Sequence, residues 1–199
     1  MKAIIINQIK QSIEVKQLLL EDYQLILKIE EAAKQIVAAI QNGKKTLIAG
    51  NGGSAADAQH FAGEFVNKFY FDRPGIPCIA LSTDTSIMTA IGNDYGYDYV
   101  FERQIQAQAV KGDVFIGIST SGNSKNIIRA LKECKDKGVF SIGLTGEKEC
   151  KMDSLCDICL KAHSNETPRI QEAHILIEHI ICCLVEDSLF GGLNPNKKA

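Results

Sequence analysis

Apolar residues recur at helical spacing through the first forty residues of the chain. Isoleucines and leucines return every few positions over residues 3–20, and a second series over 22–42 stops at Gly43. This spacing is typical of amphipathic helices, and a glycine just past the last periodic position is typical of a helix end. The pattern therefore predicts two helices within residues 1–43, which either pack on the rest of the chain or form a bundle with another copy.

Beyond residue 43 the pattern changes to short apolar runs separated by helical stretches. Strands are expected at 46–49, 77–81, 113–118, 139–144 and 157–160, and helices from Ser54, from Asp84 through Ile91, over 99–110 and 124–137, and from Pro168 to Phe190. Strands that alternate with helices form a parallel sheet covered on both faces. We therefore expect a single α/β domain over 1–199. It has a five-stranded parallel sheet flanked by helices, two added N-terminal helices, and a flexible polar tail over 191–199.

Composition and charge argue against several classes of protein. A net charge of −2 gives no reason to expect nucleic acid or an anionic membrane as a partner. No apolar run approaches the length of a membrane span, and the run at 4–6 is too short for a signal-peptide core. The expected location is therefore the cytoplasm.

The chain has seven cysteines, and their spacing is irregular. Cys156-x-x-Cys159 has the spacing of a metal or redox motif, but a zinc ribbon needs a second such pair, and only Cys150 lies nearby. A redox motif opens a helix, whereas residues 157–160 read as a strand. We expect these thiols to be reduced packing residues.

The first distinctive stretch follows the strand at 46–49 and reads Gly50-Asn51-Gly52-Gly53-Ser54. Glycines let a ligand approach the backbone, and the start of a helix, with Ser54 as its expected cap, favours an anion. His60 and Glu64 are four residues apart, so they share one helix face. The stretch combines an expected anion site with an acid–imidazole pair, although a solvated surface pair has the same spacing.

The same glycines formally match a dinucleotide-binding fingerprint over residues 50–55. That fingerprint requires an acidic residue at the end of the next strand. Here Ser82 and Thr83 stand at that point, and Asp84 is late and is expected to cap a helix. A dehydrogenase is therefore a distant alternative.

A second loop, Ser119-Thr120-Ser121-Gly122-Asn123-Ser124, follows the most apolar strand and opens a helix. Hydroxyls and the free amides of a helix start suit a phosphate group. No lysine has the spacing of a triphosphate-binding loop. The alternative is an ordinary serine-rich turn, but its place at the carboxyl end of a central strand favours phosphate.

Together these loops resemble those of the sugar isomerase (SIS) domain family, whose members bind phosphosugars. Within that family the chain is most similar to the phosphoheptose isomerases. The resembling segments are G-N-G-G-S-A-A-D-A-Q-H-F-A-G-E, L-S-T-D-T-S-I-M-T-A-I-G-N-D-Y-G-Y, I-S-T-S-G-N-S and R-I-Q-E-A-H-I-L-I-E-H, which span residues 50–179.

The resemblance implies a flavodoxin-like three-layer sandwich, a homotetramer with active sites between subunits, and roles for individual residues. It assigns substrate contacts to Asn51, Gly52, Gly53, Glu64, Asn93, Asp94, Ser119, Thr120, Ser121, Ser124 and Gln171. His60, Glu64, Gln171 and His179 match the positions that bind Zn²⁺ in metal-containing members, and Glu64 and His179 match the catalytic base and acid. Spacing alone does not suggest zinc, because glutamine is not a usual ligand.

The residues themselves support part of this assignment. Gln171, Ile175 and His179 form a stripe on the last helix, and that stripe is expected to face His60 and Glu64. Taken alone, His179 also fits a buried core histidine, since isoleucines surround it.

The function that the resemblance implies is aldose–ketose isomerisation through an enediol. The substrate is sedoheptulose 7-phosphate and the product D-glycero-D-manno-heptose 7-phosphate, at the start of ADP-heptose synthesis for the lipopolysaccharide core. The alternative is a non-catalytic relative of the type that associates with the replication initiator DnaA. We expect such a binder to lack equivalents of Glu64 and His179, which this chain has. A phosphosugar-sensing regulator would need a DNA-binding module, and the N-terminal helices are acidic to neutral.

Overall fold

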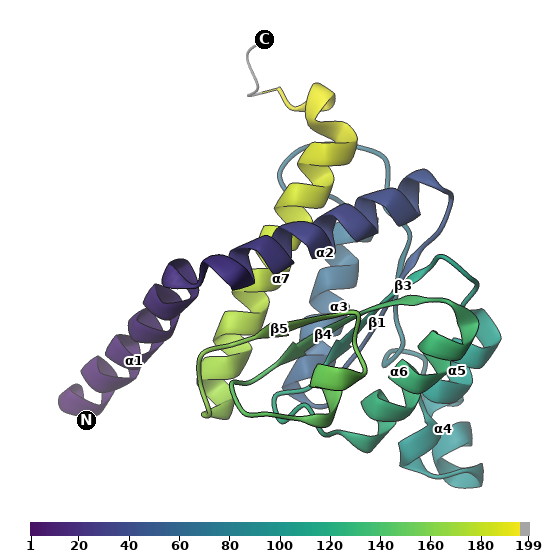
Figure 1. Cartoon of the computed structure of the whole chain (residues 1–199), viewed down its shortest axis with the longest axis horizontal. Helices are drawn as coiled ribbons and strands as arrows, with labels where there is room; N and C mark the ends of the chain where they lie inside the picture. The colour runs from purple at the N-terminus through teal and green to yellow at the C-terminus, as the bar shows by residue number, and fades with distance from the viewer. Residues whose placement is uncertain (196–199) are drawn as a thin grey trace.

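The computed structural model describes residues 1–195 of the chain. Two long helices come first, and strands then alternate with helices until a final long helix (Figure 1). The helices are α1 (Lys2–Glu21), α2 (Tyr23–Gln41), α3 (Gly53–Val66), α4 (Thr85–Asp94), α5 (Glu102–Gln108), α6 (Lys125–Lys137) and α7 (Thr167–Phe190). The strands are β1 (Thr46–Ala49), β2 (Cys78–Ala80), β3 (Val114–Ile118), β4 (Phe140–Thr145) and β5 (Ile158–Lys161).

All five strands are parallel, and their order in the sheet is β2-β1-β3-β4-β5. The chain builds outward from β1 to β2 and then returns to place β3 on the other side of β1. The loops that follow β1 and β3 therefore leave neighbouring strands at the point where the order reverses. In open parallel sheets this is where ligands bind.

Two separate cores cover the two faces of the sheet, which makes the fold a three-layer sandwich. Successive side chains of a strand point to opposite faces. Accordingly Ile116 joins the core under α2, α3 and α7, whereas Phe115 joins the core under α5 and α6. Because both faces are buried, β3 reads as a continuous apolar run, and the predicted α/β class is confirmed.

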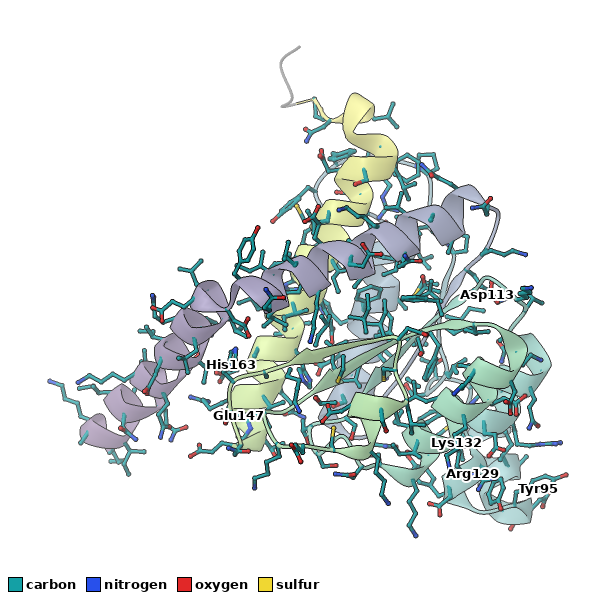
Figure 2. All side chains as sticks on the ribbon, viewed as in Figure 1. Tyr95, Asp113, Arg129, Lys132, Glu147 and His163 are labelled. Carbon is teal, nitrogen blue, oxygen red and sulfur yellow. The ribbon has the colours of Figure 1, made fainter. Side chains whose placement is uncertain are left out.

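Helix α1 extends away from the sheet and leaves much of its apolar surface exposed (Figures 1 and 2). Only Val15 and Leu19 of this helix are buried, although several of its apolar side chains are more than half exposed. The exposed apolar residues of α1 are Ile4, Ile5, Ile6, Ile9, Ile13, Leu18 and Leu20. In the described chain no helix is long and apolar enough to cross a membrane.

The predicted elements are all present, but three local expectations are wrong. Helix α3 starts at Gly53 and takes Gly52, at φ +56°, as its N-cap, so Ser54 lies buried inside the first turn and does not cap it. Helix α4 begins as expected at a cap by Asp84, which accepts a hydrogen bond from Ile87 N at 2.9 Å, but runs on to Asp94. The expected loop over 92–96 is thus mostly helix.

The third difference concerns the segment after α4. The helix expected over 99–110 is a 3₁₀ turn at Tyr97–Tyr99 followed by the short α5. In the expected tail, Gly191–Leu193 forms a 3₁₀ turn, and residues 196–199 lie outside the described residues.

Candidate functional site

The loops after β1 and β3 are joined by a reciprocal pair of amide hydrogen bonds. Asn51 Nδ2 donates to Asn126 Oδ1, and Asn126 Nδ2 donates to Asn51 Oδ1, both at 2.9 Å. Asn126 is buried in the first turn of α6. The two predicted ligand loops are therefore held as one unit at the switch point of the sheet.

Three hydroxyls converge in the loop after β3. The Oγ of Ser119 lies 2.9 Å from that of Ser124 and 3.4 Å from that of Ser121. Ser124 is the N-cap residue of α6, yet its hydroxyl makes no capping bond to the helix. Gly122, at φ +61°, turns the chain so that the hydroxyls gather at the start of α6. Hydroxyl donors at a helix N-terminus are the chemistry that binds a phosphate group.

A cleft of ≈ 270 Å³ opens beside this loop. Thr120 and Ser121 line one wall, and the segment after β4, which includes Glu147 and Lys148, lines the other. Glu147 accepts a hydrogen bond from Asn165 Nδ2 at 3.0 Å, which closes the far side. Figure 2 shows Glu147 on the side of the molecule opposite Asp113, which precedes β3, so the cleft lies at the carboxyl ends of the strands.

The structure brings His60, Glu64 and His179 together across α3 and α7. The Nε2 atoms of the two histidines are 2.9 Å apart, and His60 Nε2 is 3.3 Å from Glu64 Oε1. One ligand atom from each of the three residues lies within 4.8 Å of those of the others, and the side chain of His60 is 47% exposed. The cluster lies at the surface of the chain, and it brings His179 to the face of α3 that carries His60 and Glu64.

Gln171 lies nearer the amino end of the same helix pair. A Cβ atom added to Gly53 would be 2.3 Å from Gln171 Nε2, so this side chain packs on the first residue of α3. Eight residues separate Gln171 from His179, which is about 12 Å along a helix axis. Within this chain Gln171 therefore adjoins the glycine loop after β1, and its expected place as a metal ligand stays a prediction.

Asn93 and Asp94 lie exposed in the last turn of α4, and Asn93 Nδ2 donates to Asp94 Oδ1 at 2.8 Å. Their expected substrate contact stays a prediction, but the segment that follows them does reach the site. Tyr97 donates its hydroxyl proton to Asn51 Oδ1 at 3.0 Å. Sequence reasoning missed Tyr97 and Asn126, because their partner is 46 residues distant from one and 75 from the other.

A buried acid lies next to His179 in the interface between α3 and α7. Glu178 is 1% exposed, and within residues 1–195 neither of its carboxylate oxygens has a hydrogen-bond partner. Burial, and to a smaller extent the negative charge of Asp57, raises the pKa of Glu178 to about 9. Glu178 is therefore protonated, and uncharged, at neutral pH.

The cysteines are free thiols that are buried or partly buried. All seven are free thiols, and burial raises the pKa of Cys159 to about 11. Among the described residues, the histidine–glutamate cluster is the single group of His, Cys, Asp and Glu ligands placed closely enough for a metal ion. The packing role predicted for Cys156 fits its position against Gly143, where an added Cβ would be 2.6 Å from its sulfur.

His174 makes the free energy of unfolding dependent on pH. It is fully buried, and its Nε2 donates to the carbonyl of Thr145 at 3.1 Å. Burial lowers its pKa from 6.5 to about 4. The stability that the neutral ring contributes is present above pH 6.5 and is lost as the pH falls through 4.

Between pH 7 and pH 4 we expect the free energy of unfolding of the wild type to fall by about 3 kcal/mol more than that of His174→Gln, measured by urea unfolding. Parallel curves for the two proteins would contradict this expectation.

Comparisons with known proteins agree with this geometry. A family model for the SIS domain matches residues 13–146. The phosphoheptose isomerase 2 of Campylobacter jejuni is 66% identical over 180 residues, which cover 90% of each chain. The phosphoheptose isomerase of Aneurinibacillus thermoaerophilus is 61% identical over 184 residues, or 92% of this chain and 93% of the relative.

Solved structures give the same answer. The phosphoheptose isomerase from Neisseria gonorrhoeae superposes with a TM-score of 0.88 at 40% identity, covering 94% of this chain and 98% of its own. That from Francisella tularensis gives a TM-score of 0.89 at 36% identity, covering 94% and 99%. The fold and the hydroxyl loop at the switch point define a SIS-domain protein. More particularly, this chain belongs to the phosphoheptose isomerase family.

Proposed function

We propose that this protein is an enzyme that interconverts sedoheptulose 7-phosphate and D-glycero-D-manno-heptose 7-phosphate. The observation that carries the proposal is a phosphate-type loop tied to the start of α3, the helix that carries His60 and Glu64 of the carboxylate–imidazole cluster. The named phosphoheptose isomerases, at 61% and 66% identity, support the same reaction. Its place at the first step of ADP-heptose synthesis for lipopolysaccharide core follows from this proposal.

The reaction moves one proton between C1 and C2 of the sugar through an enediol. In the proposed mechanism Glu64 removes the proton next to the carbonyl and returns it to the neighbouring carbon. His179 moves a proton between the two oxygens. Both groups come from rigid helices, so their relative positions are fixed before the substrate binds.

The phosphate group is held at a distance from the reacting carbons. Ser119, Thr120, Ser121 and Ser124 bind it in the loop after β3, and Asn51, Gly52, Gly53, Asn93, Asp94 and Gln171 contact the sugar. Binding energy from this unreactive end of the substrate can be used to orient C1 and C2.

We propose Zn²⁺ as the cofactor, held by His60, Glu64 and His179, with Gln171 as the fourth ligand implied by the family pattern. The first three fit a zinc ion, because two imidazole nitrogens and a carboxylate oxygen already lie within 4.8 Å of one another. When bound, zinc polarises carbonyl and hydroxyl oxygens. A carboxylate that ligated a metal would be a weaker base, so the roles proposed for Glu64 as metal ligand and as base would compete.

The assembly proposed is a homotetramer with active sites between subunits. Two features support it. The catalytic cluster is open on the surface of the single chain, and α1 carries a run of exposed isoleucines and leucines. Exposed apolar surface of this kind is typical of an interface between chains.

The proposed location is the cytoplasm, with neither a nucleic acid nor a membrane as partner. Seven free thiols are consistent with a reducing compartment, and the net charge is −2. The alternative of a non-catalytic protein that binds a replication initiator receives no support from the relatives named above.

The direct test is incubation of the purified protein with sedoheptulose 7-phosphate, with the product identified by NMR before and after chelation of metal. Formation of the heptose phosphate, reduced by chelation, supports both the reaction and the cofactor. No product with metal present would overturn the proposed reaction. Equal rates with and without chelator would overturn the proposed cofactor.

Replacement of two loop hydroxyls should weaken binding of the phosphate group. We expect Ser121→Ala together with Ser124→Ala to raise KM for the sugar phosphate roughly 30- to 900-fold, at a cost of about 1–2 kcal/mol for each of the two hydrogen bonds lost. The change in kcat is expected to be smaller, because neither hydroxyl touches the reacting carbons. A serine outside the loop, Ser12 on exposed α1, provides the matched control as Ser12→Ala. An unchanged KM would place the phosphate elsewhere.

A further inference from the structure

Arg73 makes an unusually complete set of hydrogen bonds at the end of α3. Its side chain is 1% exposed, and its guanidinium donates to four backbone carbonyls. These are Glu64 O at 2.8 Å, Phe65 O at 2.6 Å, Pro74 O at 3.0 Å and Asn67 O at 3.2 Å. The last carbonyls of a helix have no partner within it, and a cation there also interacts favourably with the helix dipole. Arg73 thus closes the turn of α3 that carries the proposed base.

Glu186 on α7 completes this arrangement from the other side. Its Oε1 accepts from Arg73 Nε and from Phe69 N, and its Oε2 accepts from Tyr70 N, at 2.9, 2.8 and 2.7 Å. The side chain of Glu186 is 1% exposed, as is that of Arg73. Breaking such a pair by removing one partner leaves a buried charge uncompensated. The end of α3 and the segment after it are therefore fastened to α7 at one carboxylate.

Glu186 also holds a residue whose ring packs near the imidazole of His179 on α7. Phe69, whose amide binds Glu186, places its ring 5.6 Å from the ring of His179, centroid to centroid. His179 and Glu186 are seven residues apart, two turns on one face of the helix. Glu186 is therefore linked to Glu64 through Arg73 and to His179 through Phe69.

We propose that the Arg73–Glu186 pair positions the carboxylate on α3 and the imidazole on α7 for proton transfer. Neither residue contacts the substrate. Each acts through the backbone of Glu64 or the ring of Phe69. The inference rests on the proposed function for its kinetic readout, but not for its structural one.

The kinetic test uses Glu186→Gln, which preserves shape but loses the charge. We expect kcat for isomerisation to fall roughly 10- to 100-fold, because misplacement by about 1 Å can cost a hundredfold. KM should stay within about twofold, because the phosphate loop is untouched. Arg73→Lys keeps the charge but loses the fork that serves several carbonyls. It should show the same split, and it serves in place of Glu186→Gln if that variant does not fold.

Asp113→Asn is the matched control. Asp113 is equally buried and accepts from three donors, Lys45 N, Lys45 Nζ and Val110 N, but it lies at the opposite end of the sheet from the phosphate loop. Its loss should lower the melting temperature about as much as Glu186→Gln does, without changing kcat. Equal kcat in the wild type and Glu186→Gln, with both variants destabilised alike, would overturn the proposal and leave the pair a structural ion pair.

A second readout does not depend on activity. Ring ¹H–¹⁵N spectra of the metal-free protein should show a shifted His179 signal in Glu186→Gln and an unchanged one in Asp113→Asn, with the signal assigned from its absence in His179→Ala. An unshifted signal would overturn the proposal even if kcat falls. A wild type without isomerase activity would remove the proposed function, and this spectrum would still decide whether the pair positions the imidazole.

Discussion

Glu64→Gln is expected to lower kcat for isomerisation by roughly 10²- to 10⁴-fold while the protein stays folded, which is the usual range for loss of a positioned general base. Glutamine has nearly the shape of glutamate but cannot accept a proton from carbon. The side chain of Glu64 is 26% exposed, and its Oε1 lies 3.3 Å from His60 Nε2. Neutralising this carboxylate should therefore cost little stability.

Two measurements check this expectation. Turnover by NMR gives kcat, and exchange of the C1 or C2 proton with deuterium from solvent reports proton removal even without net product. Glu30→Gln is a suitable control, because Glu30 is also a helical glutamate in an exposed i,i+4 ion pair, with Lys34 on α2. Near-wild-type turnover in the Glu64 variant would exclude this residue as the base. Loss of turnover with exchange retained would assign Glu64 a different role.

The sheet and its helices could be predicted because each depends on local pattern. The run at 46–49 is a strand with those bounds, since residues buried on both faces leave a continuous apolar signal. The errors occurred where several local solutions compete. Ser54 has the chemistry of a cap, but Gly52, two positions earlier, has the positive φ that turns the chain and is the N-cap of α3. Which of the two residues caps α3 depends on tertiary packing, and the local sequence does not contain that information.

The candidate site could be predicted in part for a related reason. Spacing placed His60 with Glu64 on one face of a helix, and the stripe on the last helix gave His179 a matching face. The two imidazoles, whose Nε2 atoms are 2.9 Å apart, belong to residues 119 positions apart in the chain. A periodic sequence pattern cannot predict such a long-range contact. The same holds for Arg73 and Glu186, which are 113 positions apart. From the sequence alone, a single arginine in a loop is expected to be a solvent-exposed charge, and only the fold shows that Arg73 is buried.

Zinc is expected to raise the melting temperature of the wild type and to leave that of His60→Ala/His179→Ala unchanged. Binding to the native state alone stabilises it by about 2.7 kcal/mol when the free metal is a hundredfold above its dissociation constant. For a chain of this size that corresponds to roughly 5–10 °C. His163→Ala is the matched histidine control, because His163 binds Asp22 at 2.9 Å and lies apart from the cluster.

A Gln171→Ala variant and the oligomeric state complete the test of the metal site. If Gln171 ligates zinc, its loss should reduce the zinc-dependent rise, although its side chain packs on Gly53 about 12 Å along α7 from His179. An undiminished rise would leave His60, Glu64 and His179 as the protein ligands.

Sedimentation should show a tetramer with and without zinc, because the exposed apolar face of α1, rather than the metal, is expected to hold the subunits together. A monomer would contradict the shared site, and a zinc-dependent rise that survives loss of both histidines would place the metal elsewhere.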